Sequence, residues 1–251
     1  MTWRAYGASV RGSSHARVDL PCQDAHAWRP IPGGIACAVA DGLGSAAQAD
    51  EGARRAVAEA LDALAMNIPQ GCEESQLLAI ESAIRAAFVA ARAALTRAAA
   101  HTPLRDYATT LLIAAATVDW TAVGQIGDGG VVGRWPDGRL ETLSSPQRGE
   151  YVNEVVPLTA DDALERLRVV VWPLPVQALA LFSDGLQALA MDLGSGEPFE
   201  PFFAPFLQAI ADPFDAITTS QRLAAFLDAP RVCARTDDDK TLLVAGTPPP
   251  A

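Results

Sequence analysis

The chain lacks several features on which common classes of protein depend. Its four cysteines, Cys22, Cys37, Cys72 and Cys233, are widely spaced and form no C-x-x-C pair. This spacing argues against a zinc site or a disulfide framework and predicts a reducing, cytoplasmic location. The N-terminus shows no apolar segment of the signal-peptide type. No uninterrupted apolar run reaches the roughly 18 residues of a membrane-spanning helix, so we predict no membrane association.

Positive charge is also scarce. The 251 residues include 19 basic and 30 acidic ones, which gives a net charge of −11. This balance argues against binding to nucleic acid or to an anionic membrane surface. Half of the residues are hydrophobic, enough for a sizeable core. No repeat or low-complexity linker divides the chain, so we predict a single domain over residues 1–251.

Three widespread catalytic or nucleotide-binding motifs are missing. The sequence contains no G-x-G-x-x-G, no G-x-x-x-x-G-K-[ST] and no G-x-S-x-G. Their absence argues against dinucleotide-binding enzymes, P-loop nucleotide hydrolases and serine hydrolases of the nucleophile-elbow type.

The periodicity of the apolar residues predicts a mixed α and β chain. Apolar residues at helical spacing indicate helices over 53–64, 77–95, 199–210 and 216–227. Apolar runs and alternation indicate strands over 3–10, 25–28, 35–40, 111–117, 121–126, 130–135, 140–143, 169–172, 178–182 and 241–245. The strands between 111 and 143 are separated by tight turns, which predicts an antiparallel meander. We expect residues 144–168 to form a polar surface insertion or flap, and 247–251 a frayed tail.

The stretch Asp41-Gly42-Leu43-Gly44-Ser45 follows the apolar strand at 35–40 directly. Its two glycines allow main chain to approach a ligand closely. An isolated Asp-Gly pair is usually only a turn. Here the strand-then-Asp pattern recurs at Asp184, and another Asp cluster lies near the C-terminus. Asp24 and Asp41 also flank a predicted hairpin, which would bring both carboxylates to one end of a sheet.

Five aspartates stand at or beside predicted strand ends: Asp24, Asp41, Asp128, Asp184 and Asp238. Carboxylates about 4 Å apart repel by roughly 4 kcal/mol per pair at an effective dielectric near 20, so a converging cluster needs protons or cations. Oxygen ligands completed by water suit Mg²⁺ or Mn²⁺ rather than zinc. Two such ions could polarise a phosphoryl oxygen and activate water without a protein nucleophile. The spacing alone leaves the alternative of five unconnected turn aspartates open.

His15 has two interpretations. Its position near Asp24 in the sequence is compatible with a phosphate ligand or a general acid, and equally with an ordinary surface histidine. His101 is predicted to be a solvated loop residue.

Six short motifs resemble, in their order, those of the metal-dependent type 2C Ser/Thr protein phosphatases. They are Gln23-Asp24-Ala25-His26, Asp41-Gly42-Leu43-Gly44, Thr109-Thr110-Leu111, Gly127-Asp128-Gly129, Ser183-Asp184-Gly185-Leu186 and Asp238-Asp239-Lys240-Thr241. The resemblance extends from about residue 5 to 246. Pro21-Cys22-Gln23-Asp24 and Gly149-Glu150-Tyr151-Val152-Asn153-Glu154 are similar to the bacterial family 2 branch.

The resemblance implies an α+β fold, a four-layer αββα sandwich of two packed antiparallel sheets, each covered by a pair of helices. It implies attack of a water or hydroxide bridging two Mg²⁺ or Mn²⁺ ions on a phosphoserine or phosphothreonine ester. The implied partners are a phosphoprotein substrate and a cognate Ser/Thr kinase in cytoplasmic signalling.

The resemblance also assigns roles to individual residues. Asp41 would be shared by both ions and the Gly42 carbonyl would bind the second. Asp184 and Asp238 would bind the first ion, with Asp41 and Asp184 central to catalysis. Asp24 would bind metal directly or through water. Asp128 would contribute with Asp184 to a third, weaker site.

The sequence departs from the family pattern at the phosphate-binding position. Many members have an arginine five residues before the Asp24 equivalent, but this chain has Asp19 there. Arg17 or His15 could take over that role. An acidic residue found in some relatives four positions after Asp184 is Ala188 here, which would weaken the third site.

Three functional hypotheses therefore remain. The chain could be an active protein phosphatase. It could be a catalytically weak or inactive module of the same fold that binds a phosphoprotein or kinase partner. It could also be a phosphatase of a small phosphorylated metabolite.

Overall fold

The computed structural model describes residues 2–69, 74–144, 155–211 and 214–248. Its strands form two five-stranded sheets, in the orders β1-β10-β9-β6-β7 and β2-β3-β4-β5-β8. Every strand pairing is antiparallel. The strands are β1 Arg4–Val10, β2 Asp24–Ile31, β3 Gly34–Asp41, β4 Leu111–Thr117, β5 Thr121–Ile126, β6 Gly130–Arg134, β7 Leu140–Ser144, β8 Arg168–Trp172, β9 Ala178–Phe182 and β10 Lys240–Gly246.

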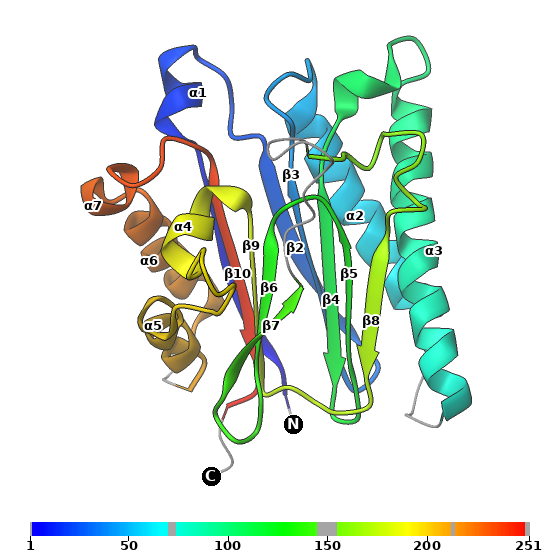
Figure 1. Ribbon diagram of the computed structural model, residues 1–251, viewed down its shortest axis with the longest axis vertical. Coiled ribbons are helices and arrows are strands. Elements are labelled where there is room, and N and C mark those ends of the chain that lie inside the picture. Colours follow the sequence, from blue (N-terminus) through cyan, green and yellow to red (C-terminus); the bar gives the residue numbers. More distant parts are fainter. Residues whose placement is uncertain (1, 70–73, 145–154, 212–213, 249–251) are drawn as a thin grey trace.

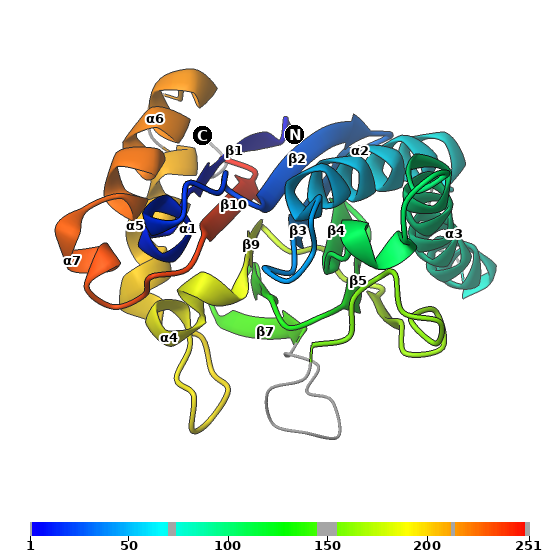
Figure 2. The same ribbon diagram turned by 90° about the horizontal axis from the view of Figure 1, so that it is seen from above.

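The longer helices lie on the outer faces of the two sheets (Figures 1 and 2). The helices in the described residues are α1 Ser13–Arg17, α2 Ala49–Asn67, α3 Glu74–Ala98, α4 Gln187–Ala190, α5 Glu200–Ala211, α6 Ala216–Leu227 and α7 Pro230–Cys233, with 3₁₀ turns η1 Leu104–Tyr107 and η2 Asp184–Leu186. The long helices α2 and α3 cover one sheet, whereas α5 and α6 cover the other.

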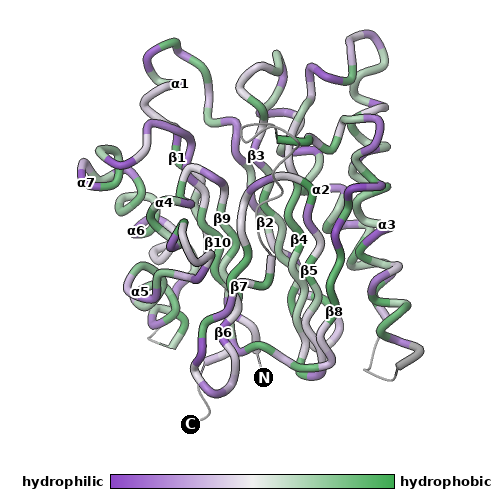
Figure 3. Tube along the Cα trace, viewed as in Figure 1, coloured by the Kyte–Doolittle hydropathy of each residue, from purple (hydrophilic) through white to green (hydrophobic). Residues whose placement is uncertain are grey.

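Three hydrophobic layers hold this arrangement together. Along β3, Ile35, Cys37 and Val39 pack between the two sheets, whereas the intervening alanines pack against α2 and α3. The outer face of the other sheet packs against phenylalanines of α5. Side chains of a strand point to alternate faces, so strands that are apolar on both faces supply two layers at once. The strands accordingly carry long green stretches in Figure 3. The predicted four-layer αββα sandwich is confirmed.

The chain changes sheet at Gly127-Asp128-Gly129. β5 pairs with β4 and β8, whereas β6 pairs with β7 and β9. The prediction of one continuous meander over 111–143 is therefore wrong at this turn, because a period of two does not reveal which sheet a strand joins. Gln125 holds the turn by donating from Nε2 to the carbonyls of Gly127 and Gly129, at 3.0 and 2.9 Å.

Two further segments differ from the prediction. The segment between β1 and β2, for which no helix is predicted, contains the short helix α1. The expected surface insertion at 144–168 is irregular over 155–167, but it is packed against the protein: Leu158 and Ala163 are fully buried in the layer under α2 and α3. Arg92 of α3 fixes it by donating to the carbonyls of Leu158 and Ala160, both at 2.6 Å.

Some predicted features fall partly or wholly on undescribed residues. The Gly149–Glu154 motif and residues 249–251 of the expected tail lie outside the described residues. Thr247 is described, and its N–H donates to the Gln177 carbonyl at 2.9 Å. Over the described ranges, no helix has both the length and the apolar character needed to cross a membrane.

Gly52 sets the distance between α2 and the segment that leads to Thr109. A Cβ at this position would collide with the Tyr107 carbonyl oxygen. Gly52→Ala should therefore destabilise the protein by about 1–3 kcal/mol through overpacking, although alanine favours a helix by about 1 kcal/mol. Urea unfolding measures this change. The exposed helix position Ala58 supplies the control, since Ala58→Gly should cost only about 1 kcal/mol. A Gly52→Ala variant as stable as the wild type would contradict this packing.

Candidate metal centre

The strand register brings the predicted carboxylates to one end of both sheets. Asp24 and Asp41 are direct partners in the β2–β3 pairing, which confirms the predicted hairpin. In the other sheet, Phe182 of β9 pairs with Gly130 on one side and Leu242 on the other. The turn before β6, the segment after β9 and the segment before β10 therefore leave that sheet at the same end, and they carry Asp128, Asp184 and Asp238 respectively.

Four of these carboxylates line one pocket of about 310 Å³. Its described lining residues are His15, Asp41, Gly42, Leu43, Gly44, Thr110, Asp128, Val155, Asp184 and Asp238. The alternative of five unconnected turn aspartates does not describe this arrangement.

The backbone of Asp41 is held from the β4 side. Thr110 Oγ1 accepts a hydrogen bond from the Asp41 N–H at 2.9 Å, and the Thr110 N–H donates to the Asp41 carbonyl at 2.8 Å. Thr109 Oγ1 donates to the same carbonyl at 3.0 Å. A Cβ on Gly42 would lie 2.6 Å from the Ala49 carbonyl oxygen. Glycine at 42 is thus required by the close approach of α2, a reason that the sequence motif alone does not reveal.

Asp24 lies behind the pocket and is absent from its described lining. It is 7 % exposed. Its Oδ2 accepts hydrogen bonds from Ser183 Oγ at 2.7 Å and from Thr241 Oγ1 at 2.8 Å. The structure therefore brings Asp24 next to Asp41 but directs one of its oxygens towards two hydroxyl groups of the other sheet.

His15 is held by a carboxylate that the sequence analysis did not single out. His15 Nδ1 lies 2.9 Å from Asp239 Oδ2. Asp239 also accepts hydrogen bonds from the backbone N–H groups of Gly12 and Gln23, at 2.6 and 2.5 Å. His15 Nε2 lies 3.7 Å from the point that a Cβ of Gly44 would occupy. The imidazole thus has one nitrogen fixed by Asp239 and the other turned towards the pocket.

The three consecutive aspartates before β10 have three different environments. Asp237 lies at the surface, where its carboxylate pairs with Arg17 at 2.9 Å. Asp238 lines the pocket, and Asp239 is buried at 2 % exposure. Arg17 is itself largely exposed and is absent from the described lining, so the geometry does not support it as a phosphate ligand. The spacing in the sequence could not distinguish these three carboxylates.

Burial and mutual repulsion raise the pKa values of the clustered carboxyl groups. Desolvation is the largest cause in each case. It raises the pKa of Asp24 and of Asp128 to about 7, with the charge of Asp184 adding to both. The pKa of Asp41 is raised well above its usual range, with further contributions from the charges of Asp24 and Asp184. The pKa of Asp238 is raised in the same sense.

The chemistry of these groups fits a divalent cation. Asp24 Oδ1 and Asp184 Oδ1 are buried acceptors without a hydrogen-bond partner in the described part of the chain, and such an acceptor costs about 1–3 kcal/mol. The described residues contain no ready-made group of three or more His, Cys, Asp or Glu ligands. Mg²⁺ usually keeps several waters and binds one or two carboxylates rather than an all-protein cage. The pocket therefore fits a hydrated Mg²⁺ or Mn²⁺ ion.

A sequence model of the family Protein phosphatase 2C matches residues 11–228. The chain therefore belongs to the protein phosphatase 2C family, a family of phosphatase enzymes, and the resemblance noted in its motifs is confirmed. Serine/threonine-protein phosphatase 3 from Escherichia coli (strain K12) is 36 % identical over 257 residues, which cover 98 % of each chain.

Solved structures share the fold. The Mycobacterium tuberculosis serine/threonine phosphatase PstP/Ppp matches with a TM-score of 0.62 at 18 % identity, over 99 % of this chain and 100 % of that chain. RsbX in complex with magnesium matches with a TM-score of 0.57 at 14 % identity, over 97 % of this chain and 94 % of that chain. At these identities the likeness concerns the fold alone.

The raised pKa values predict how the stability of the metal-free protein depends on pH. A carboxyl group with a raised folded-state pKa stabilises the fold fully below its unfolded pKa, and this stabilisation is lost as the pH rises through the folded value. For Asp128 that range runs from 3.8 to about 7. In EDTA, the free energy of unfolding should therefore fall as the pH rises, by up to about 1.4 kcal/mol per pH unit for each such group.

Asp128→Asn should make this fall shallower. The exposed turn residue Asp119 provides a matched control, because Asp119→Asn removes the same charge outside the pocket. Urea unfolding at several pH values measures the three slopes. Equal slopes in all three proteins would contradict the electrostatic description of the pocket.

Proposed function

We propose that the protein hydrolyses phosphoserine and phosphothreonine esters of protein substrates, with two Mg²⁺ or Mn²⁺ ions bound in the acidic pocket. One observation carries this proposal: Asp41, Asp128, Asp184 and Asp238 line a single pocket in a member of a phosphatase family. The relative at 36 % identity is named a serine/threonine-protein phosphatase, which supports the substrate class. The magnesium complex of RsbX, a structure of the same fold, supports the metal.

In this proposal each acidic side chain of the cluster has a defined role as a metal ligand. Asp41 would be shared by both ions, and the Gly42 carbonyl would contribute to the second. Asp184 and Asp238 would hold the first ion, and Asp128 with Asp184 would hold a weaker third one. Asp24 would contribute through water, since it is absent from the described lining of the pocket.

The bound ions would supply a water of lowered pKa and would neutralise charge on the phosphoryl group. No arginine is among the described residues that line the pocket, and His15 is the one lining side chain there that can become cationic. Substrate binding should therefore depend on the metal more strongly than in an enzyme with an arginine at this position.

His15 is proposed as the general acid. Asp239 accepts from Nδ1, which orients the ring and leaves Nε2 towards the pocket. A proton on Nε2 can then pass to the serine or threonine oxygen as its bond to phosphorus breaks. Asp239 contributes by positioning His15 rather than by contacting the substrate.

The two other hypotheses receive less support. An inactive binding module would not require all of Asp41, Asp184 and Asp238 in one pocket. A metabolite phosphatase would use the same chemistry, so a comparison of substrates must distinguish it. A phosphoprotein substrate further implies a cognate Ser/Thr kinase, which we include in the proposal.

The first test is metal-dependent hydrolysis of a phosphoserine peptide. We expect activity with Mn²⁺ or Mg²⁺, none in EDTA, and loss of most activity in Asp184→Asn. Calorimetric titration with Mn²⁺ should show that Asp41→Ala abolishes tight binding, whereas Asp128→Ala weakens only a low-affinity phase. Activity that persists in EDTA or in Asp184→Asn would refute the proposal. A strong preference for small phosphorylated metabolites over phosphopeptides would replace the protein substrate.

The second test separates the general acid from the metal ligands by using two leaving groups. His15→Gln should lower kcat for a phosphoserine peptide by about 10²–10⁴-fold. It should affect p-nitrophenyl phosphate much less, because nitrophenolate leaves without a proton. Asp239→Asn should show the same selectivity more weakly, and the exposed His101→Gln variant should resemble the wild type. An equal loss on both substrates would rule out His15 as the proton donor.

A further inference from the structure

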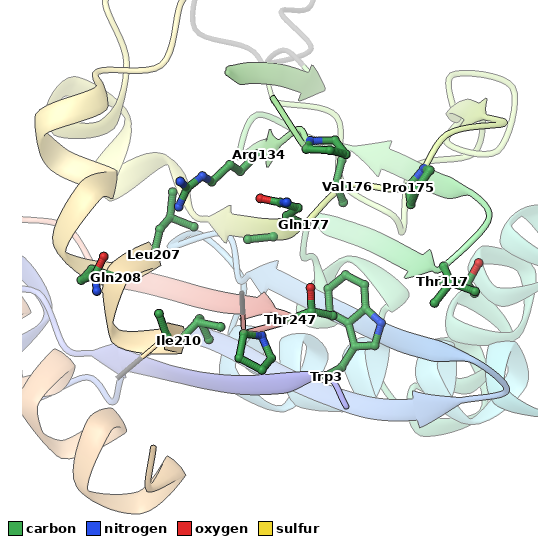
Figure 4. A pocket seen from close by; sticks show the side chains of 15 residues that line it. Trp3, Thr117, Arg134, Pro175, Val176, Gln177, Leu207, Gln208, Ile210 and Thr247 are labelled. Carbon is green, nitrogen blue, oxygen red and sulfur yellow. The ribbon is translucent and has the colours of Figure 1, made fainter. Parts of the chain in front are cut away.

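A second cavity lies at the opposite end of the sheets from the acidic pocket. It has a volume of about 400 Å³. Its walls come from the end of β4, the end of β6, the start of β9 and the last turns of α5, together with Trp3 before β1 and Thr247 after β10 (Figure 4). The volume falls at the lower end of the range of about 300–1,000 Å³ typical of small-molecule sites.

The lining is mostly apolar and carries a single charged side chain. The apolar residues are Trp3, Val118, Pro136, Pro175, Val176, Ala178, Leu207, Ile210, Ala211 and Pro248. Thr117, Gln177, Gln208 and Thr247 add polar groups, and Arg134 is the one charged residue in the described lining. An apolar wall with few polar groups and one cation is the composition expected of a site for an amphipathic ligand.

The guanidinium group of Arg134 has no hydrogen-bond or ion-pair partner among the described residues. Most other described arginines pair with carboxylates, for example Arg92 with Asp161 and Arg139 with Glu141. Arg105, Arg168, Arg222 and Arg235 also lack a carboxylate partner among the described residues, but they are exposed, whereas Arg134 is half-buried. In a chain of net charge −11, a half-buried cation without a carboxylate partner is an unusual feature.

The backbone around Arg134 is fixed. Arg134 pairs with Leu140 of β7 and with Ala178 of β9. Its carbonyl accepts a hydrogen bond from the Gln177 N–H at 2.7 Å. The guanidinium therefore projects from a paired strand rather than from a free loop, and Figure 4 shows it reaching from β6 towards α5. A rigid base of this kind lowers the entropy cost of binding.

We propose that this cavity binds a small monocarboxylate with an apolar aliphatic or aromatic body. The carboxylate pairs with Arg134, whose planar guanidinium suits two parallel hydrogen bonds to it. The apolar body fills the space between Trp3, Val176 and Ile210. A phosphate group fits less well, because a dianion would face a single cation among apolar walls.

The test is calorimetric titration of the full chain with octanoate, with 1-octanol and octylamine as matched neutral and cationic ligands. We expect octanoate to bind at least about tenfold more tightly than either. Arg134→Gln should remove that preference. Arg139→Gln, which neutralises an exposed arginine on the adjoining hairpin, should leave it unchanged. Ala211→Phe, which fills part of the cavity without changing charge, should weaken both octanoate and octanol.

The outcomes that overturn the proposal are distinct. They are no heat of binding with octanoate, equal loss in Arg134→Gln and Arg139→Gln, or displacement of octanoate by inorganic phosphate. Octanoate binding that appears only after deletion of residues 249–251 would assign the cavity to the chain's own end instead. Thermal unfolding checks that each variant folds, and Arg134→Lys, expected to retain part of the preference, serves if Arg134→Gln does not fold. Because the readout is binding heat, the result is independent of phosphatase activity.

Discussion

Repulsion between clustered carboxylates is the constraint on which the rest of this structure depends. Asp24, Asp41, Asp128 and Asp238 are held where burial and neighbouring negative charge raise their pKa values. A chain is stable in that arrangement only if protons or cations neutralise it. A divalent cation neutralises the cluster while the carboxylates stay ionised at neutral pH. The same electrostatic cost that opposes folding of the metal-free cluster therefore favours metal binding once the fold is formed.

The scaffold meets this cost by fixing main chain rather than by adding basic side chains. Thr109 and Thr110 hold the backbone of Asp41 through hydrogen bonds. The Asp239 carboxylate accepts hydrogen bonds from the N–H groups of Gly12 and Gln23, and it also contacts His15 Nδ1. The carboxylates are thus aligned by groups that do not neutralise them. This leaves their charge available to a cation, and it leaves His15 as the one side chain lining the described pocket that can take up a positive charge.

Sequence reasoning found the carboxylates because each follows or precedes a strand, and the hairpin register then placed Asp24 opposite Asp41. It missed the change of sheet at Asp128, because alternation of apolar residues is the same in either sheet. It gave Asp239 no role. Which of the adjacent residues Asp237, Asp238 and Asp239 is buried depends on tertiary contacts, here with Gly12, His15 and Gln23, which the sequence does not reveal. It offered Arg17 or His15 as the phosphate ligand, and the structure pairs Arg17 with Asp237 at the surface and places His15 in the pocket lining. Local sequence patterns predict where strands end, but they do not predict contacts between segments that are distant in the sequence.

The most direct test of the metal assignment is a crystal of the protein soaked in Mn²⁺ and measured at the manganese absorption edge. The two-metal account predicts two strong anomalous peaks in the pocket bounded by Asp41, Asp184 and Asp238, with Asp239 still bonded to His15. A weaker third peak near Asp128 is compatible with it. No peak in this pocket, or manganese bound at Asp239 in place of His15, would contradict the account.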